Sequence, residues 1–291
     1  MKRILLSLSI FFLFAKSFAQ PITVHTTTYT VPQLVQDVLF GNGTAGSACV
    51  GTINNITWST GSNFGSHNGI GYFTNTNPNF PLTNGVILST GRIDQIPGPN
   101  TQQLGGFGDQ IWPGDNQLFN YINSLGIDSG LTDYNDATIL EFDFTPLTDQ
   151  MSFDFLFASE EYGTFQCTFS DAFAFFLTNT TAGTPAVNLA LVPGTVTETP
   201  ISVTTIRDNS NLPTCDAANP AFFGSNNEGA AAAAAAAIDF NGQTVLMTAN
   251  ATVIPGNTYH IKLVIADRND QSYDSAVFLG GGSFNIGTAD L

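Results

Sequence analysis

Two neighbouring stretches decide the fold class: Leu140-Glu141-Phe142-Asp143-Phe144 and Phe153-Asp154-Phe155-Leu156-Phe157. In each stretch the aromatic residues occupy alternate positions, and most of the carboxylates fall between them. Successive side chains of a β-strand point to opposite faces, so this period of two predicts strands with one face in the core and the other in solvent. Half-buried strands of this kind are typical of antiparallel sheets.

Similar runs continue along the chain, and turn signals such as Pro193-Gly194 and Asn241-Gly242 separate them. Many short strands with turns between them predict a mostly β fold, an antiparallel β-sandwich or jelly-roll-like single domain. Further strands are predicted over residues 86–89, 172–178, 189–192, 201–206, 244–253, 259–266 and 276–279.

Two short helices interrupt the strand pattern. Residues 32–39 begin with a proline at the entry and have Thr30 near the cap, as helix starts often do. Residues 115–125 follow Pro113-Gly114 and place apolar side chains on one side of a helix. We therefore expect a mostly β domain with two or more short helices.

Composition sets the class of protein. The chain has 291 residues, of which 43% are hydrophobic, so it can build a sizeable core. Only 10% of the residues are charged, and 23 carboxylates against 7 Lys and Arg give a net charge of −16. This balance repels phosphate backbones, and we exclude nucleic acid as a partner.

The N-terminus carries an export signal. Lys2 and Arg3 precede an apolar run over residues 4–15, and Ser17-Phe18-Ala19 places small residues at a cleavage site. This order predicts a secretory signal peptide over residues 1–19, and therefore a secreted or cell-surface protein. The apolar run is too short for a transmembrane helix, which needs roughly 20 residues. Without these residues, four basic side chains face 23 acidic ones, a net charge of −19 that invites divalent cations.

Cysteine usage is sparse. Of the three cysteines, Cys167 and Cys215 lie in polar, turn-rich segments, and an oxidising compartment permits one bridge. We predict that these two pair and that Cys49 stays unpaired within the domain. The alternative, three reduced and partly buried thiols, stays open.

Catalytic motifs are scarce. His25, His67 and His260 lie far apart and form no i, i+4 metal pair, and the sequence has no nucleophile elbow, Walker loop or H-E-x-x-H motif. His260 lies in a predicted strand, where a hydrogen-bonded sheet residue is the expected role. Residues 230–237 are eight consecutive alanines, which we interpret as an insertion on a surface loop with no chemistry attached. We predict no enzymatic activity.

Two acidic clusters stand out because charged residues are otherwise so few. Both lie at ends of predicted strands, where carboxylates and amides can supply the six to eight oxygens that calcium takes. If both segments lie at one end of the sandwich, they can share an ion. The predicted calcium ligands are Glu160, Glu161 and Asp171 in the first cluster, and Asp267, Asp270 and Asp274 in the second.

Three other interpretations of the acidic residues remain open. Asp and Asn at strand ends often hydrogen-bond their own turns, and acidic side chains also keep strand edges apart. Arg268 can form a bidentate pair with one of these acids and neutralise part of the cluster. Two carboxylates across a cleft would also suffice for glycoside hydrolysis.

Several motifs together carry a family resemblance over roughly residues 27 to 286. They include Phe155-Leu156-Phe157-Ala158-Ser159-Glu160-Glu161-Tyr162-Gly163, then Asp171-Ala172-Phe173-Ala174-Phe175-Phe176-Leu177, and the run from Tyr259 to Asp267. In this combination the chain resembles the choice-of-anchor L domain of exported bacterial surface proteins, common in Bacteroidetes-type bacteria.

The resemblance implies a β-rich extracellular module that precedes varied anchors or sorting domains and has no settled enzymatic activity. We therefore expect a non-enzymatic secreted or cell-surface module for adhesion or for glycan or matrix contact, stabilised by calcium. Its partner would be an extracellular glycan or a surface protein. The alternative is a carbohydrate-active hydrolase that uses paired carboxylates. Residues 20–291 are predicted to form the domain, with the alternative that they are the N-terminal part of a longer protein.

Overall fold

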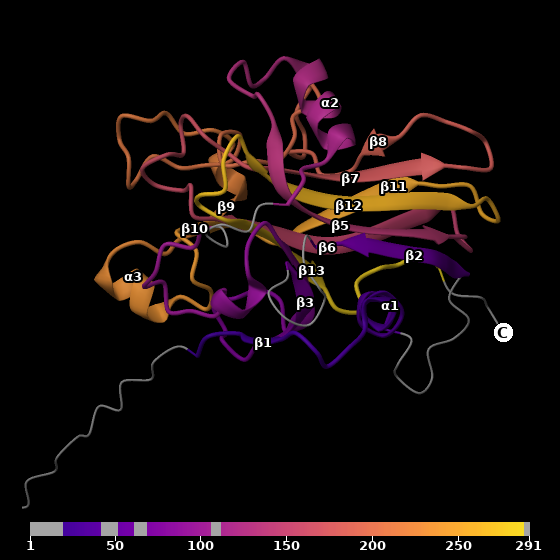
Figure 1. Ribbon diagram of the computed structural model, residues 1–291, viewed down its shortest axis with the longest axis horizontal. Helices are drawn as coiled ribbons and strands as arrows, with labels where there is room; N and C mark the ends of the chain where they lie inside the picture. Colours follow the sequence, from indigo (N-terminus) through magenta and orange to yellow (C-terminus); the bar gives the residue numbers. More distant parts are fainter. Residues whose placement is uncertain (1–19, 42–51, 61–68, 106–111, 288–291) are drawn as a thin grey trace, which may run out of the picture.

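The computed structural model describes residues 20–41, 52–60, 69–105 and 112–287. The predicted signal peptide, Cys49 and His67 lie outside these residues. Two antiparallel sheets face each other across a common core, and short helices lie at their surfaces (Figure 1). The predicted mostly β fold in a single domain is confirmed.

The larger sheet has eight strands, in the order β1-β3-β4-β13-β6-β10-β9, and β11 pairs with β6 as well. Its long strand β6 holds the predicted Phe153 to Phe157 alternation. The bounds are β1 (Thr23–His25), β3 (Ile70–Thr74), β4 (Asn84–Ser89), β6 (Gln150–Ser159), β9 (Phe223–Asn226), β10 (Gly242–Thr244), β11 (Met247–Thr252) and β13 (Ser275–Gly280).

The smaller sheet has five strands, in the order β2-β5-β12-β7-β8. Its central strand β12 pairs with β5 on one side and β7 on the other, so Leu263 lies between Leu140 and Phe175. The bounds are β2 (Ile53–Ser59), β5 (Tyr134–Phe144), β7 (Ala172–Asn179), β8 (Val187–Asn188) and β12 (Tyr259–Arg268).

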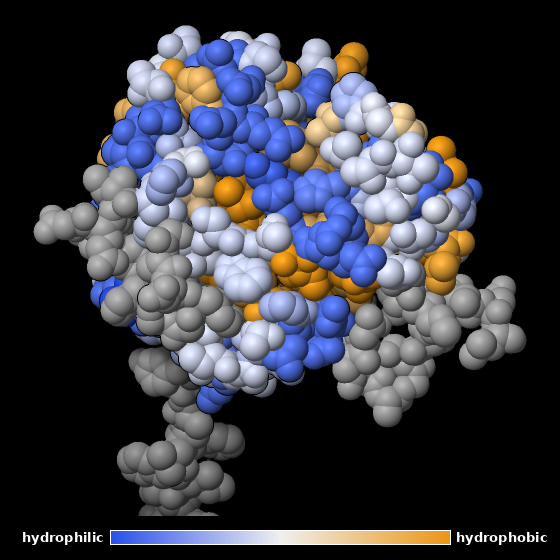
Figure 2. Space-filling view, turned by 45° about the vertical axis from the view of Figure 1, so that its right-hand side comes forward, coloured by the Kyte–Doolittle hydropathy of each residue, from blue (hydrophilic) through white to orange (hydrophobic). Residues whose placement is uncertain are grey.

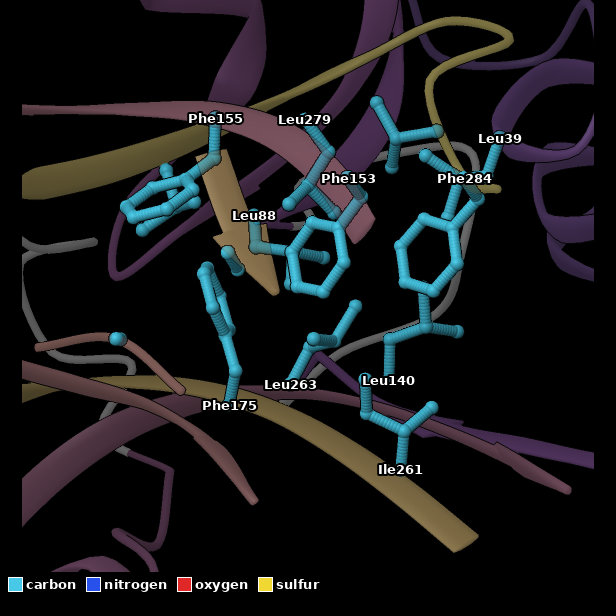
Figure 3. Packing of buried hydrophobic residues seen from close by; sticks show 14 of the residues in the cluster. Leu39, Leu88, Leu140, Phe153, Phe155, Phe175, Ile261, Leu263, Leu279 and Phe284 are labelled. Atoms are coloured by element: carbon cyan, nitrogen blue, oxygen red, sulfur yellow. The ribbon is translucent and has the colours of Figure 1, made fainter. Parts of the chain in front are cut away.

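The main core lies between the sheets, where the period-two residues of both meet. Figure 3 shows Phe153, Phe155 and Leu279 reaching from the larger sheet toward Phe175 and Leu263 of the smaller one. All five side chains are at most 1% exposed. Burial of each contributes about 1.5–3 kcal/mol, so the alternation read in the sequence is the main source of stability for the sandwich.

Two helical segments match the predicted ones. Helix α1 (Val31–Gln33) continues into the π-helical turn η1 (Leu34–Leu39), which buries four of its six side chains. Helix α2 (Asn116–Leu125) begins where the Asp115 carboxylate accepts the Leu118 N–H and ends at Gly126, in the left-handed conformation that favours glycine. Leu118 and Ile122 cover the outer face of the smaller sheet.

The strand predicted over residues 189–192 is displaced: β8 covers Val187–Asn188, and Leu191 forms an isolated bridge with Pro200. The strand predicted over residues 201–206 is wrong. Residues 201–206 form turns, because the hydroxyl of Thr205 accepts the Ser202 N–H at 2.9 Å and the Ile206 N–H donates to the Ser202 carbonyl at 2.9 Å. Ile201 and Ile206 are nevertheless buried in the core. The apolar pattern therefore predicted correctly that these side chains are buried. It did not predict the backbone conformation, because local side-chain hydrogen bonds stabilise turns here.

The alanine run is only partly the surface insertion that we predicted. Helix α3 (Ala230–Ala235) is partly exposed, but Ala236 and Ala237 are buried. The Ala237 carbonyl accepts the Ile22 N–H at 2.9 Å and the Gly98 N–H at 3.0 Å. The C-terminal end of the run is therefore part of the packed structure, where the small side chain lets three segments approach. The remaining short helices are η2 (Ile93–Gln95) and η3 (Pro220–Phe222).

Candidate functional site

The topology brings the two acidic segments to one end of the sandwich. Residues 160–171 link β6 to β7, and residues 269–274 link β12 to β13. Ser159 at the end of β6 pairs with Ser275 at the start of β13, and Ala172 at the start of β7 pairs with Ala266 near the end of β12. Both links therefore cross between the sheets at the same end.

The acids at this end are buried. Of the six predicted ligands only Asp270 is exposed, and a further carboxylate that sequence reasoning missed, Asp136 of β5, joins them at 0% exposure. Asp136 is the third residue of β5 and lies four positions before Leu140. We call the following residues the acidic cluster: Asp136, Glu160, Glu161, Asp171, Asp267 and Asp274, all at most 5% exposed.

Backbone N–H groups fix one oxygen of several cluster carboxylates. The Asp171 N–H donates to Glu161 Oε2 at 2.7 Å, and the Arg268 N–H donates to Asp171 Oδ1 at 3.0 Å. Glu160 Oε1 accepts the Leu104 N–H at 3.1 Å. These bonds hold the carboxylates in place and join the two crossing segments.

Other oxygens of the cluster have no hydrogen-bond partner among the described residues. They are Oε2 of Glu160, Oδ2 of Asp136, Oδ2 of Asp171 and both oxygens of Asp267. A buried carboxylate without a partner costs free energy, because water no longer solvates it. Asp267 is 1% exposed and neither of its oxygens accepts a hydrogen bond of good geometry from the described residues, although the Thr90 hydroxyl favours its ionised form.

Arg268 does not neutralise the cluster by the pairing that we considered. Its side chain forms a bidentate pair with Asp128, outside the six predicted ligands, with Nη2 at 2.7 Å from Oδ1. The guanidinium also lies over the Phe169 ring, 5.5 Å from its centre. Its charge still favours the ionised form of Glu161. The proposed pairing with a cluster acid is therefore wrong.

Burial and mutual repulsion raise the pKa values of the cluster. Burial raises the pKa of Asp136 to about 6, of Asp171 to about 7 and of Glu160 to about 8. Burial, followed by the charges of Asp171 and Asp274, holds the pKa of Asp267 well above its ordinary value. Such a cluster either takes up protons at neutral pH or binds a cation, which reverses the effect.

Within the described ranges, no three His, Cys, Asp or Glu side chains are already arranged around a common point as metal ligands. Calcium, however, takes six to eight oxygens and accepts backbone carbonyls, hydroxyls and water as well as carboxylates. One or two cluster carboxylates together with such oxygens are chemically sufficient for it.

A cavity of about 640 Å³ adjoins the cluster. We call it the Phe169 pocket, because the Phe169 ring forms one wall and is 41% exposed. Asp171 of the cluster and the Asp128–Arg268 pair also line it, which places the pocket beside the unpaired carboxylates. A second, more polar cavity of about 430 Å³ is lined by Glu160, Glu228, Asn241 and Tyr273.

A disulfide joins the segment 160–171, between β6 and β7, to the loop that carries Cys215. Cys167 and Cys215 are joined in the structure, with their Cα atoms 5.7 Å apart. Because Cys167 lies between Glu161 and Asp171, the bond restrains the segment that carries half of the predicted calcium ligands.

His260 lies on the smaller sheet and outside the cluster. Its Nδ1 is 2.7 Å from Asp143 Oδ1 and its Nε2 is 2.9 Å from Glu141 Oε2, both on the neighbouring strand β5. The predicted role as a hydrogen-bonded sheet residue is confirmed. The hydrogen bond to Glu141 is the main cause of a raised His260 pKa.

The outer surface on the face shown in Figure 2 is mostly hydrophilic, with hydrophobic residues in small groups between polar ones.

Comparison with known families assigns this architecture. The profile of the choice-of-anchor L domain matches residues 23–285, nearly the whole chain. The chain belongs to the choice-of-anchor L domain family. Membership in this family indicates a surface-associated, non-catalytic module of a secreted or surface protein.

Two further comparisons add no relative of this choice-of-anchor L domain. No curated protein and no solved structure matches the chain significantly. In the part of the chain that the structure describes, none of the helices has the length and apolar character needed to cross a membrane.

Proposed function

We propose that this choice-of-anchor L domain is a secreted or cell-surface contact module, which adheres to a glycan, matrix component or surface protein and whose acidic end is stabilised by calcium. Residues 1–19 would direct export, and the mature chain would carry no enzymatic activity. The family membership and the export signal support the location, and the acidic cluster supports the calcium.

The observation that carries the calcium proposal is Asp267. Both of its carboxylate oxygens are buried without a hydrogen bond of good geometry among the described residues, and the charges of Asp171 and Asp274 beside it outweigh the favourable effect of the Thr90 hydroxyl. Arg268, the basic residue next in the chain, has its side chain turned to Asp128. A divalent cation would supply the missing partner and offset the repulsion.

A cation between the two crossing segments would help the domain to bind a partner. The crossing segments 160–171 and 269–274 connect strands of a rigid sandwich, and loops held by such a scaffold commonly carry binding residues. A cation between them would hold their backbone in one arrangement. Calcium in this role would stabilise a surface and would not take part in a reaction.

Calcium binding to the purified chain tests the proposal by isothermal titration calorimetry. The parent should bind calcium, and Asp267→Asn should weaken binding by about tenfold or more, because it removes a charged ligand. Asp149→Asn is the matched control: it removes one charge from an exposed residue before β6, at the opposite end of the strand from Glu160. Equal binding by the parent and Asp267→Asn would contradict the proposed site.

Surface location is tested on intact source cells. Antibody against the purified domain should label unpermeabilised cells or detect the chain in the medium. Detection only after the cells are broken would contradict export and, with it, the contact function.

One observation favours the carbohydrate-active hydrolase as a second candidate. Glu160 and Glu228 line the same polar cavity, and burial raises the pKa of Glu160 to about 8, as a general acid requires. Turnover of a polysaccharide that Glu160→Gln abolishes would support it. Absence of turnover across neutral and acidic polysaccharides would leave the contact function as the account of this protein.

A further inference from the structure

The Phe169 pocket combines an exposed aromatic wall with fixed polar groups. Phe169 is 41% exposed although its ring contacts Phe165, at 5.9 Å between ring centres, and the Arg268 guanidinium. These contacts hold the ring in one orientation at the wall of the cavity. An aromatic ring presented in this way offers a flat apolar surface of fixed direction.

Hydrogen bonds hold the polar groups of the same pocket in position. Asp128 accepts from the Arg268 guanidinium and from the Gly130 N–H at 3.1 Å. Asn269 donates to the Gly130 carbonyl at 2.8 Å and accepts from Thr132. Arg268 has five N–H groups and gives two to Asp128, so this wall holds both donors and acceptors.

The charge of the pocket selects among ligands. Arg268 is neutralised by Asp128, and the wall also carries the acidic Asp171, so the described residues that line the pocket have no net positive charge. The mature chain also carries a net charge of −19. An anionic ligand would therefore be repelled, and a neutral one would not.

We propose that the Phe169 pocket binds a neutral saccharide, the end of a glycan chain. A pyranose ring has an apolar face of C–H groups, which fits the Phe169 ring, and a rim of hydroxyls that donate and accept, which fits Asp128, Arg268 and Asn269. The volume of about 640 Å³ lies within the range of small-molecule sites. This inference rests on the proposed contact function and names its ligand class and its site.

The pocket is coupled to the acidic cluster through one residue. Asp171 lines the pocket, and its Oδ1 accepts the backbone N–H of Arg268 at 3.0 Å. A cation held by Asp171 and its neighbours would fix the position of Arg268 and hence of the polar wall. Saccharide binding in this pocket is therefore stronger with calcium than with a chelator.

Calorimetric titration of the mature chain with maltotriose, cellotriose, mannotriose and chitotriose tests the proposal, with trigalacturonate as the anionic comparison. We expect at least one neutral trisaccharide to bind in calcium. Phe169→Ala should weaken it by about tenfold, because the stacking surface is lost, whereas Phe169→Trp should retain it. Val196→Ala is the control, since Val196 is fully exposed at 104% and lies outside the pocket.

Three results would overturn the inference: no neutral trisaccharide bound at millimolar concentration, binding unchanged in Phe169→Ala, or preference for trigalacturonate. Melting of the same preparations in calcium and in chelator separates the two proposals. A calcium-dependent rise in melting without saccharide binding would refute the pocket and leave the calcium site standing. Binding that depends on Phe169 without such a rise would refute the calcium site and leave the pocket.

Discussion

The backbone N–H of Arg268 donates to the carboxylate of Asp171 at 3.0 Å, so the last residue of β12 is fixed to the residue that precedes β7. The same two residues border both features of this end of the molecule. Asp171 belongs to the buried acidic cluster, and Arg268 turns its side chain away from it to Asp128 and the Phe169 pocket. A change in the cluster is therefore expected to reach the pocket through one hydrogen bond.

Gly91 packs directly against the cluster, and an added methyl group there should disturb it without changing its charge. A Cβ at Gly91 would lie 1.7 Å from Asp274 Oδ2, so Gly91→Ala must displace that carboxylate. We predict that Gly91→Ala reduces the calcium-dependent rise in melting temperature while the fold is retained. Melting in calcium and in chelator, followed by circular dichroism, measures this.

Gly105→Ala is the control for this change, because a Cβ there has no neighbour nearer than 3.5 Å, an ordinary contact. It should keep the full calcium response. A full response in Gly91→Ala as well would show that the position of Asp274 is not needed for calcium binding.

The disulfide should stabilise the domain. The two cysteines are 48 positions apart in the sequence, and the double variant Cys167→Ser with Cys215→Ser removes the bond that closes this loop. In the chain-entropy model this lowers the free energy of unfolding by about 4 kcal/mol, measured by urea denaturation. A non-reducing peptide map of exported protein should join Cys167 to Cys215. A bridge from Cys49 to either of them, or three titratable thiols, would be incompatible with the prediction.

His260 should make stability depend on pH. Its neighbours on β5 are Glu141 and Asp143, Lys262 lies two residues along its own strand, and Thr178 pairs with it on β7. Because its folded-state pKa is raised above the ordinary 6.5, its contribution is full below about pH 6.5 and is lost as the pH rises through the raised value.

The variant His260→Gln isolates this contribution. The stability of the parent minus that of the variant, from urea unfolding at several pH values, should decrease as the pH rises above the ordinary histidine pKa of about 6.5. A difference that stays constant over this range would mean that the charge of His260 does not contribute.

Export should remove the predicted signal peptide between Ala19 and Gln20. The charged start, the apolar run and the small residues at positions 17 and 19 are the basis for this prediction. N-terminal sequencing of protein recovered from the cell surface or medium should begin at residue 20. Recovery of surface-exposed protein that still begins with Met1 would argue against it.

The sequence was most informative where burial and backbone conformation agree. Strands β5 and β6 follow the period of two over most of their length, because alternate residues point into the core between the sheets. Strands β7, β12 and β13 are buried along nearly their whole length and carry apolar residues on both faces. Residues 201–206 show the same apolar pattern in a series of turns, since Ser202 and Thr205 satisfy the backbone locally. Short edge strands such as β1 and β9 have too few residues to show any period.

The acidic residues of the candidate site could be selected from the sequence, but not their partners. Their rarity in a chain with 10% charged residues marked Glu161, Asp171 and Asp267. That Arg268 pairs with Asp128 depends on the loop after α2, which no local pattern connects to β12. The position of Asp136 likewise depends on a segment distant in sequence: its N–H donates to the Trp112 carbonyl at 2.9 Å, and its Oδ1 accepts the Trp112 N–H at 2.9 Å.

The most direct test of this account is the melting temperature of the parent, Asp267→Asn and Asp149→Asn in saturating calcium and in chelator. At calcium one hundred times its dissociation constant, binding to the native state adds about 2.7 kcal/mol, a rise of about 5 °C for a domain of this size. We predict this rise for the parent and Asp149→Asn. Asp267→Asn should show none, and in chelator it should melt no lower than the parent, because it removes a buried, unpaired charge. Equal melting of the parent in calcium and in chelator would contradict the calcium-stabilised acidic end.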